Sequence, residues 1–125
     1  MKFEIRKDKK MGRGLFATKS IKKGDLVEVC PVVVLDRVSS NRIQKTFLAS
    51  YVFSWTGGRD AIGLGHGSLF NHSLEPNVGW QLDSVRGLLI FEALRDIKPG
   101  EQLLINYQYD PSKRVWKKGK WIIKK

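Results

Sequence analysis

The chain has 125 residues, which is enough for one domain with a hydrophobic core and too few for two. Hydrophobic residues make up 42% of it, and its single cysteine and two histidines exclude both an internal disulfide framework and a zinc site built from cysteine pairs, so no metal is expected. The net charge of +11 comes from residues 1–13, with six Lys or Arg against two acids, and from residues 113–125, with seven against none.

These basic ends bear on partners and location. Residues 113–125 place Trp116 and Trp121 among their cations, a composition that suits contact with nucleic acid, although a solvated tail that aids solubility is the alternative. No stretch approaches the ~20 apolar residues of a membrane span, and the N-terminus lacks a signal peptide pattern. We therefore expect no membrane contact and an intracellular protein, cytoplasmic or nuclear, or one released into a host by a non-classical route.

Two strands are predicted in the first third of the chain. Lys2–Arg6 alternates apolar and polar residues, which is typical of a strand with Phe3 and Ile5 on one face. Leu26–Leu35 is almost continuously apolar and rich in valine, so we expect a buried strand with a bend or bulge at Pro31. Cys30 lies within this strand without a neighbouring cation, so a catalytic thiol is not expected there.

Between these strands, Gly12 and Gly14 flank Arg13 in a predicted turn that precedes Leu15. The segment is not a phosphate-binding loop, because no Gly-Lys-Ser/Thr follows and no helical pattern begins there. Two interpretations stay open at this point. The turn is purely structural, or its glycines let the main chain approach a ligand closely.

The middle of the chain contains the best helix candidate. Ser39–Asn41 supply capping side chains, and apolar residues follow at helical spacing: Ile43, Phe47, Leu48, Tyr51 and Val52. From Ala61 onward β character returns, with strands predicted at Val78–Leu82 and Leu88–Leu94 and a hairpin loop between them. The sequence therefore predicts a mainly β protein with one or two short helices.

Two later segments carry site chemistry. Asn71, His72 and Ser73 place an amide, an imidazole and a hydroxyl side by side after apolar residues, in a glycine-rich setting where backbone can approach a ligand. About thirty residues on, the Pro99-Gly100 turn leads into an apolar strand that ends at Tyr107. A phenol carried at the end of a rigid strand can be aimed at a substrate.

In order and spacing, three segments resemble the signature segments of the SET-domain protein-lysine methyltransferases: Met11–Ala17, Leu69–Asn77 and Gly100–Tyr107. The resemblance covers residues 3–110. It implies a β-clip-like SET fold of several short sheets with a knot-like, threaded C-terminal segment that brings Asn71 and Tyr107 together. We take residues 1–110 as the SET domain and residues 111–125 as a basic aromatic segment that closes the lysine channel or recruits a partner.

The resemblance also implies an activity, which is S-adenosylmethionine-dependent methylation of a lysine in a basic protein such as a histone or chromatin-like protein. Tyr107 is the implied catalytic residue. The implied cofactor-binding residues are Gly12, Arg13, Gly14, Leu15, Asn71, His72 and Tyr107. The residues expected around the substrate-lysine channel are Tyr51, Phe53, Trp80, Ile105 and Tyr109. For Tyr51 a core position, and for His72 a bond to the backbone, are the structural alternatives.

The chain departs from the family pattern because one cysteine cannot build the zinc segment that closes the channel in many members. Aromatic residues of the C-terminal segment are available for that purpose instead. The alternative function is a catalytically inactive SET-like module that binds nucleic acid or chromatin through its basic termini. The presence of Asn71 and Tyr107 favours the enzyme, and the position of the charge favours the module. Formation of a homodimer is left open.

Overall fold

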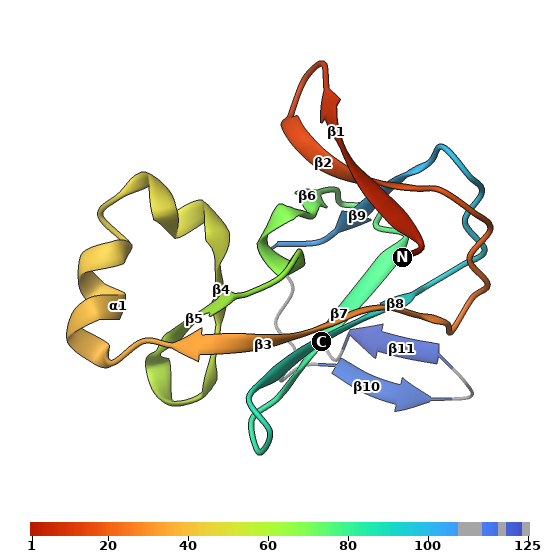
Figure 1. Ribbon diagram of the computed structural model, residues 1–125. Coiled ribbons are helices and arrows are strands. Elements are labelled where there is room, and N and C mark those ends of the chain that lie inside the picture. The colour runs from red at the N-terminus through yellow and green to blue at the C-terminus, as the bar shows by residue number, and fades with distance from the viewer. Residues whose placement is uncertain (108–113, 118–119, 124–125) are drawn as a thin grey trace.

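Figure 1 shows a computed structural model of the chain, which describes residues 1–107, 114–117 and 120–123, the last two ranges by their backbone. The strands are β1 (Phe3–Asp8), β2 (Gly12–Ala17), β3 (Leu26–Val34), β4 (Val52–Ser54), β5 (Asp60–Gly63), β6 (Asn71–His72), β7 (Val78–Asp83), β8 (Leu88–Ala93), β9 (Gln102–Ile105), β10 (Arg114–Lys117) and β11 (Lys120–Ile123). The helical segments are α1 (Arg37–Ile43) and three short 3-10 helices, η1 (Phe47–Tyr51), η2 (Thr56–Gly58) and η3 (Gly67–Leu69).

The strands form two main sheets. One has five antiparallel strands in the order β4-β5-β3-β8-β7, and the other has four strands in the order β1-β2-β9-β6. The last pair of the second sheet, β6 and β9, is parallel, with Asn71 beside Leu104 and His72 beside Ile105. The prediction of a mainly β SET fold with one or two short helices is confirmed. No helix in the described ranges is long and apolar enough to cross a membrane.

The first hairpin differs from its prediction. β1 is a strand as expected, but Phe3 is buried while Ile5 is 46% exposed, so the two side chains do not share a buried environment. The predicted turn at residues 12–14 is wrong, because Gly12 and Gly14 are paired in β2 opposite Asp8 and Arg6. The turn lies at residues 9–11, where the Asp8 carboxylate accepts hydrogen bonds from the backbone N–H groups of Lys10 and Met11.

In β3 the irregularity lies between Leu26 and Glu28, and not at Pro31, which is paired with Leu88 in regular register. Proline is tolerated here because the partner of β3 changes at this residue, from β8 along residues 26–31 to β5 along residues 32–34. The expectation that the strand is buried holds for one face only, since Val29 and Val33 are 42% and 47% exposed.

The predicted single helix is two shorter ones. Asp36, and not the Ser39–Asn41 segment, caps α1, because its carboxylate accepts from the backbone N–H of Ser39 at 2.7 Å. Thr46 adopts an extended conformation and caps η1, and this interrupts the helix. Phe47 is 78% exposed, so the helical spacing of the apolar residues does not reflect one continuous buried face.

The residues of the C-terminal segment that the structure describes form an antiparallel hairpin of β10 and β11. The predicted closure of the channel by Trp116 and Trp121 concerns side chains outside the described part of the chain, and it stays a prediction. The same holds for the predicted channel residue Tyr109, which lies outside the described residues.

Aromatic rings at the centre of the core pack between the five-stranded sheet and Phe70, which precedes β6. Phe91 is fully buried and stacks on Phe70 with a centroid distance of 4.3 Å and an interplanar angle of 19°. Phe53 meets the edge of Phe91 at 6.0 Å and that of Trp80 at 4.9 Å. The fold therefore places a rigid aromatic wall behind the space in which the functional residues gather.

We expect Phe91→Ala to lower the free energy of unfolding by about 3–5 kcal/mol, because it removes a buried ring and leaves a cavity against Phe70 and Phe53. Urea unfolding followed by tryptophan fluorescence measures the change. Val85→Ala is the matched control, since Val85 is 94% exposed and its truncation should change the stability by less than about 0.5 kcal/mol. Equal effects of the two substitutions would contradict this assignment of the core.

Candidate active site

Tyr107 is held in place by hydrogen bonds to Phe70 and to His72 of β6. Its backbone N–H donates to Nδ1 of His72 at 2.9 Å, and its hydroxyl donates to the carbonyl oxygen of Phe70. One residue earlier, the carbonyl of Asn106 accepts from the indole N–H of Trp80 at 3.1 Å. Because Nδ1 of His72 accepts from the backbone, the neutral ring carries its proton on Nε2. His72 therefore positions Tyr107, and it lies next to the cavities described below without lining either of them.

Asn77 supports the strand that leads to Tyr107, a role that sequence reasoning did not assign. It is 2% exposed, its amide donates to the carbonyl of Gln102 at 2.8 Å, and its Oδ1 accepts from the N–H of Leu104 at 2.8 Å. Its own N–H donates to the Leu104 carbonyl at 3.2 Å. This single side chain thus ties the loop after β6 to β9. The Pro76-Asn77 pair was visible in the motif, but nothing local in the sequence indicates that β9 is its partner.

Two cavities adjoin Tyr107. The larger, of about 240 Å³, is lined by residues that include Phe53, Phe70 and Trp80, and the smaller, of about 200 Å³, by residues that include Gly12, Arg13 and Asn71. Four residues line both cavities and so mark the junction between them: Ser50, Tyr51, Ser68 and Tyr107. Two hollows that meet at a pair of tyrosines can hold two substrates with their reacting atoms next to each other.

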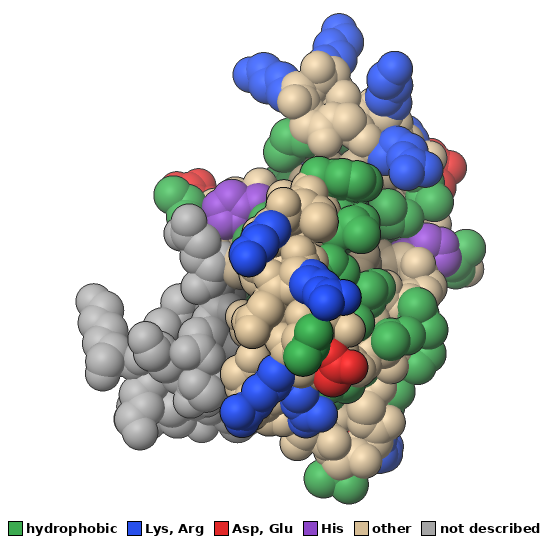
Figure 2. All heavy atoms as spheres, turned by 90° about the vertical axis from the view of Figure 1, so that its left-hand side faces the viewer, with side chains coloured by type: hydrophobic (Ala, Val, Ile, Leu, Met, Phe, Trp, Pro, Cys, Tyr) green, Lys and Arg blue, Asp and Glu red, His purple; other side chains and the backbone are tan. Residues whose placement is uncertain are grey.

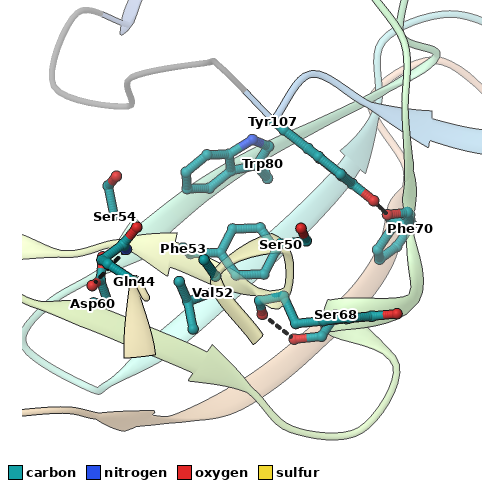
Figure 3. Close-up of a pocket in the computed structure, with 13 residues that line it drawn as sticks. Gln44, Ser50, Val52, Phe53, Ser54, Asp60, Ser68, Phe70, Trp80 and Tyr107 are labelled. Atoms are coloured by element: carbon teal, nitrogen blue, oxygen red, sulfur yellow. Dashed lines mark hydrogen bonds between the residues drawn. The ribbon is translucent and has the colours of Figure 1, made fainter. Parts of the chain in front are cut away.

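The larger cavity contains three of the residues expected in the channel, Tyr51, Phe53 and Trp80. Figure 3 shows the Phe53 and Trp80 rings between Tyr107 at one end and a group of polar side chains at the other. Ile105 does not line it and is fully buried in the core. Tyr51 is 46% exposed, so the alternative of a core position does not hold for it.

The smaller cavity gathers Gly12, Arg13 and Asn71, which come from distant parts of the sequence. Leu15 of β2, expected beside them, does not line the cavity and is fully buried in the core. Met11, Ser50, Ser68 and Leu69 also line this cavity and were not predicted. These are common apolar or small polar residues, so only their position in space distinguishes them.

Asn71 uses both amide hydrogens within the protein. Nδ2 donates to the Arg13 carbonyl at 3.1 Å and to Oε1 of Gln102 at 2.8 Å, and Gln102 in turn donates to Oδ2 of Asp8 at 3.0 Å. A Cβ at Gly14 would clash with Oε1 of Gln102 and lie 2.7 Å from Nδ2 of Asn71. A side chain at Gly14 would displace the amides of this network, which gives the glycine a structural reason beside the predicted close approach of a ligand.

The protonation of two side chains limits what the site can do. Burial, and secondarily the nearby Tyr51, raise the pKa of Tyr107 above its ordinary value, so its phenol is neutral near pH 7. Burial, and secondarily Glu28, raise the pKa of Cys30 to about 11, and this thiol is 1% exposed. Cys30 is thus a core residue and not a nucleophile, as expected. Among the described residues, no group of three or more His, Cys, Asp or Glu is placed to hold a metal ion.

Known proteins share this architecture. Residues 12–108 match the family model of the SET domain. Over 105 residues the chain is 36% identical to the Schizosaccharomyces pombe protein named histone-lysine N-methyltransferase, H3 lysine-37 specific, and the match covers 83% of this chain and 71% of that protein. A 32% identity over 126 residues links it to the variant-silencing SET domain-containing protein of Plasmodium falciparum, covering 86% of this chain and 5% of that protein.

A solved structure gives the same result. The crystal structure of a candidate histone methyltransferase from Plasmodium falciparum aligns with a TM-score of 0.71 at 29% identity, and the alignment covers 87% of this chain and 99% of that one. The chain therefore belongs to the SET-domain family, and it is an enzyme of the protein-lysine methyltransferase class.

We expect Asn71→Ala to lower the free energy of unfolding by about 1–3 kcal/mol, because the Arg13 carbonyl and Oε1 of Gln102 lose their donor. Chemical denaturation measures the loss. The matched control is Asn41→Ala, which removes an exposed amide from α1 and should change the stability by less than about 0.5 kcal/mol. If both variants were equally stable, the amide network would not contribute to the fold.

Proposed function

We propose that this chain transfers a methyl group from S-adenosylmethionine to a lysine of a basic protein such as a histone. The observation that carries the proposal is the meeting of two cavities at Tyr51 and Tyr107, one lined by aromatic rings and one by main chain and an amide. The name of the Schizosaccharomyces pombe relative supports a histone as the substrate. We also propose that the chain meets its basic protein substrate in the nucleus or the cytoplasm.

The smaller cavity fits the methyl donor by the chemistry of its lining. Gly12, with a φ of 80°, and Arg13 line the cavity. Oδ1 of Asn71 accepts no hydrogen bond from any described residue, so it is free to accept from an ammonium group. When bound there, S-adenosylmethionine would supply a methyl group on a positively charged sulfonium. The neutral amine of the lysine would form the new N–C bond as the C–S bond breaks, with S-adenosylhomocysteine as the leaving group.

The larger cavity favours the neutral form of the substrate lysine. A solvated lysine has a pKa of about 10.4, so near pH 7.4 only about one in a thousand is neutral, a penalty of about 4 kcal/mol. Phe53, Trp80 and Tyr51 offer an apolar, aromatic lining that disfavours the charged ammonium, because desolvation lowers the pKa of a buried amine. The chain thereby favours the reactive form of the substrate without a dedicated base.

Tyr107 is proposed to orient the amine. Its hydroxyl donates a hydrogen bond to the Phe70 carbonyl. The lone pairs of the hydroxyl oxygen can therefore accept a hydrogen bond from the lysine N–H at the junction of the cavities. Its raised pKa matters because a phenolate at this position would hold the lysine as an ammonium ion and block the attack. A neutral phenol directs the lone pair without trapping the proton.

The decisive experiment is incubation of the chain with isotopically labelled S-adenosylmethionine and a panel of basic proteins, with mass spectrometry of the modified residues. Methylated lysines support the proposal. Binding to chromatin or nucleic acid without any methylation would instead support the inactive binding module.

We expect Tyr107→Phe to reduce kcat by about 10²–10³-fold, because it removes only the hydroxyl that orients the amine. Calorimetry should show that the affinity for S-adenosylmethionine is nearly unchanged, which separates a loss of chemistry from a loss of folding or binding. Turnover close to that of the unaltered chain would remove Tyr107 from the catalytic role.

The β1–β2 hairpin is proposed as a contact for nucleic acid. Lys7, Lys9, Lys10 and Arg13 are exposed, and none of them forms an ion pair with another described residue. Figure 2 shows cationic side chains gathered where this hairpin projects at the top of the view. Lys7, Lys9 and Lys10 line neither cavity and repel a basic protein substrate, so they do not serve the reaction directly. A polyanion that carries the basic substrate offsets this repulsion and brings enzyme and substrate together.

We expect the triple variant Lys7→Gln, Lys9→Gln, Lys10→Gln to bind duplex DNA more weakly and with a shallower dependence on salt. The slope of log affinity against log salt concentration should fall by about 0.9 for each phosphate that the hairpin no longer neutralises. The control variant Lys19→Gln, Lys22→Gln, Lys23→Gln removes the same charge from exposed lysines of another loop. Equal slopes in the two variants would show that net charge alone governs binding.

A further inference from the structure

The larger cavity has a polar end opposite Tyr107. Asp60 of β5, Ser54 of β4 and Gln44, which follows α1, line the larger cavity but not the smaller one. Figure 3 shows these three side chains together, on the far side of Phe53 and Trp80 from Tyr107. The cavity thus runs from the tyrosine junction, past aromatic rings, to a carboxylate.

Hydrogen bonds fix the main chain of Asp60, whereas its carboxylate has few hydrogen-bond partners. Its backbone N–H donates to Oγ of Ser40 at 2.9 Å, and its carbonyl accepts from the N–H of Leu35 at 2.8 Å, so the main chain is fixed. Its carboxylate accepts one hydrogen bond, from Nε2 of Gln44 to Oδ2 at 2.9 Å. Within the described part of the chain Asp60 forms no ion pair, although the protein has a net charge of +11.

A carboxylate that lines a cavity and pairs with no described cation can form a charge-assisted hydrogen bond with a cationic ligand. The direction of the substrate follows from the two cavities. The amine of the target lysine must reach the junction at Tyr51 and Tyr107, so the rest of the substrate extends away from it, toward the end formed by Asp60. The carboxylate therefore faces residues that adjoin the target lysine.

We propose that Asp60 is a specificity-determining residue that binds an arginine or lysine flanking the target lysine in the substrate. The inference rests on the proposed function and deepens it, since it selects lysines within basic segments. Oδ1 of Asp60 is open to a guanidinium or ammonium donor, while Gln44 holds Oδ2 and fixes the orientation of the carboxylate. The rings of the cavity discriminate little between lysines in different sequences, so the charge supplies the selection.

Asp60→Asn tests this role with little structural disturbance, because the carboxamide oxygen can still accept from Gln44 while the charge is removed. The substrates are short peptides with one lysine in a neutral background and a single arginine moved through the flanking positions. For the best arginine position, Asp60→Asn should raise KM about tenfold and leave kcat nearly unchanged, since the interaction is the same in the ground and transition states. On the peptide without arginine the substitution should have little effect.

These measurements form a double-mutant cycle. The effects on KM of removing the Asp60 charge and of removing the peptide arginine should not be additive. Asp60→Arg should in turn prefer a peptide with glutamate at the same position. Asp83→Asn is the matched control, because it makes the same change of charge on a residue that lines neither cavity. Additive effects, or an equal loss with Asp83→Asn, would overturn the role of Asp60 alone. Absence of methylation by the unaltered chain would overturn the proposed function and this inference with it.

Discussion

The parallel pairing of β6 with β9 is the constraint on which the site depends. Two residues in each strand make too few bonds to hold a parallel ladder by themselves, because such ladders are normally longer and buried between helices. Asn77 supplies what the ladder lacks, since its side chain bonds to the main chain of both Gln102 and Leu104. With β9 held there, Tyr107 follows it and lies beside His72 and between the two cavities.

The amide network extends this constraint to the N-terminal hairpin. Asp8, Gln102 and Asn71 connect the turn after β1 to β9 and β6, and the absence of a side chain at Gly14 lets the amides lie close together. The backbone N–H groups of Lys10 and Met11, more than any other group, hold the pKa of Asp8 below its usual range. The acceptor of the network therefore stays ionised, and the basic hairpin is coupled to the wall of the smaller cavity.

The positive charge of the chain disfavours the binding of cationic substrates, and residues of the larger cavity offset this effect locally. Both proposed substrates are cationic, yet the described hairpin and the C-terminal residues 113–125 add positive charge to a neutral middle. An aromatic lining favours a neutral amine, and a single carboxylate at the cavity end favours a positively charged neighbour. Long-range repulsion is screened by salt over about 8–10 Å, whereas an interaction inside a cavity is screened much less, so Asp60 can select a cation that the surface repels.

The sequence by itself determined the family, strands β1, β3, β7, β8 and β9, and the β7–β8 hairpin, because apolar alternation, turn residues and motif spacing are local signals. It misjudged the Gly12–Gly14 turn and the single helix, since pairing partners and burial depend on segments far along the chain. Ile105 and Leu15, which were expected at the site, are fully buried in the core. Asn77 and Asp60 acquire their roles only from the tertiary structure. A hydrogen bond to a strand about thirty residues away, or a carboxylate left without a cation, is a property of neighbours in space, which no local pattern records.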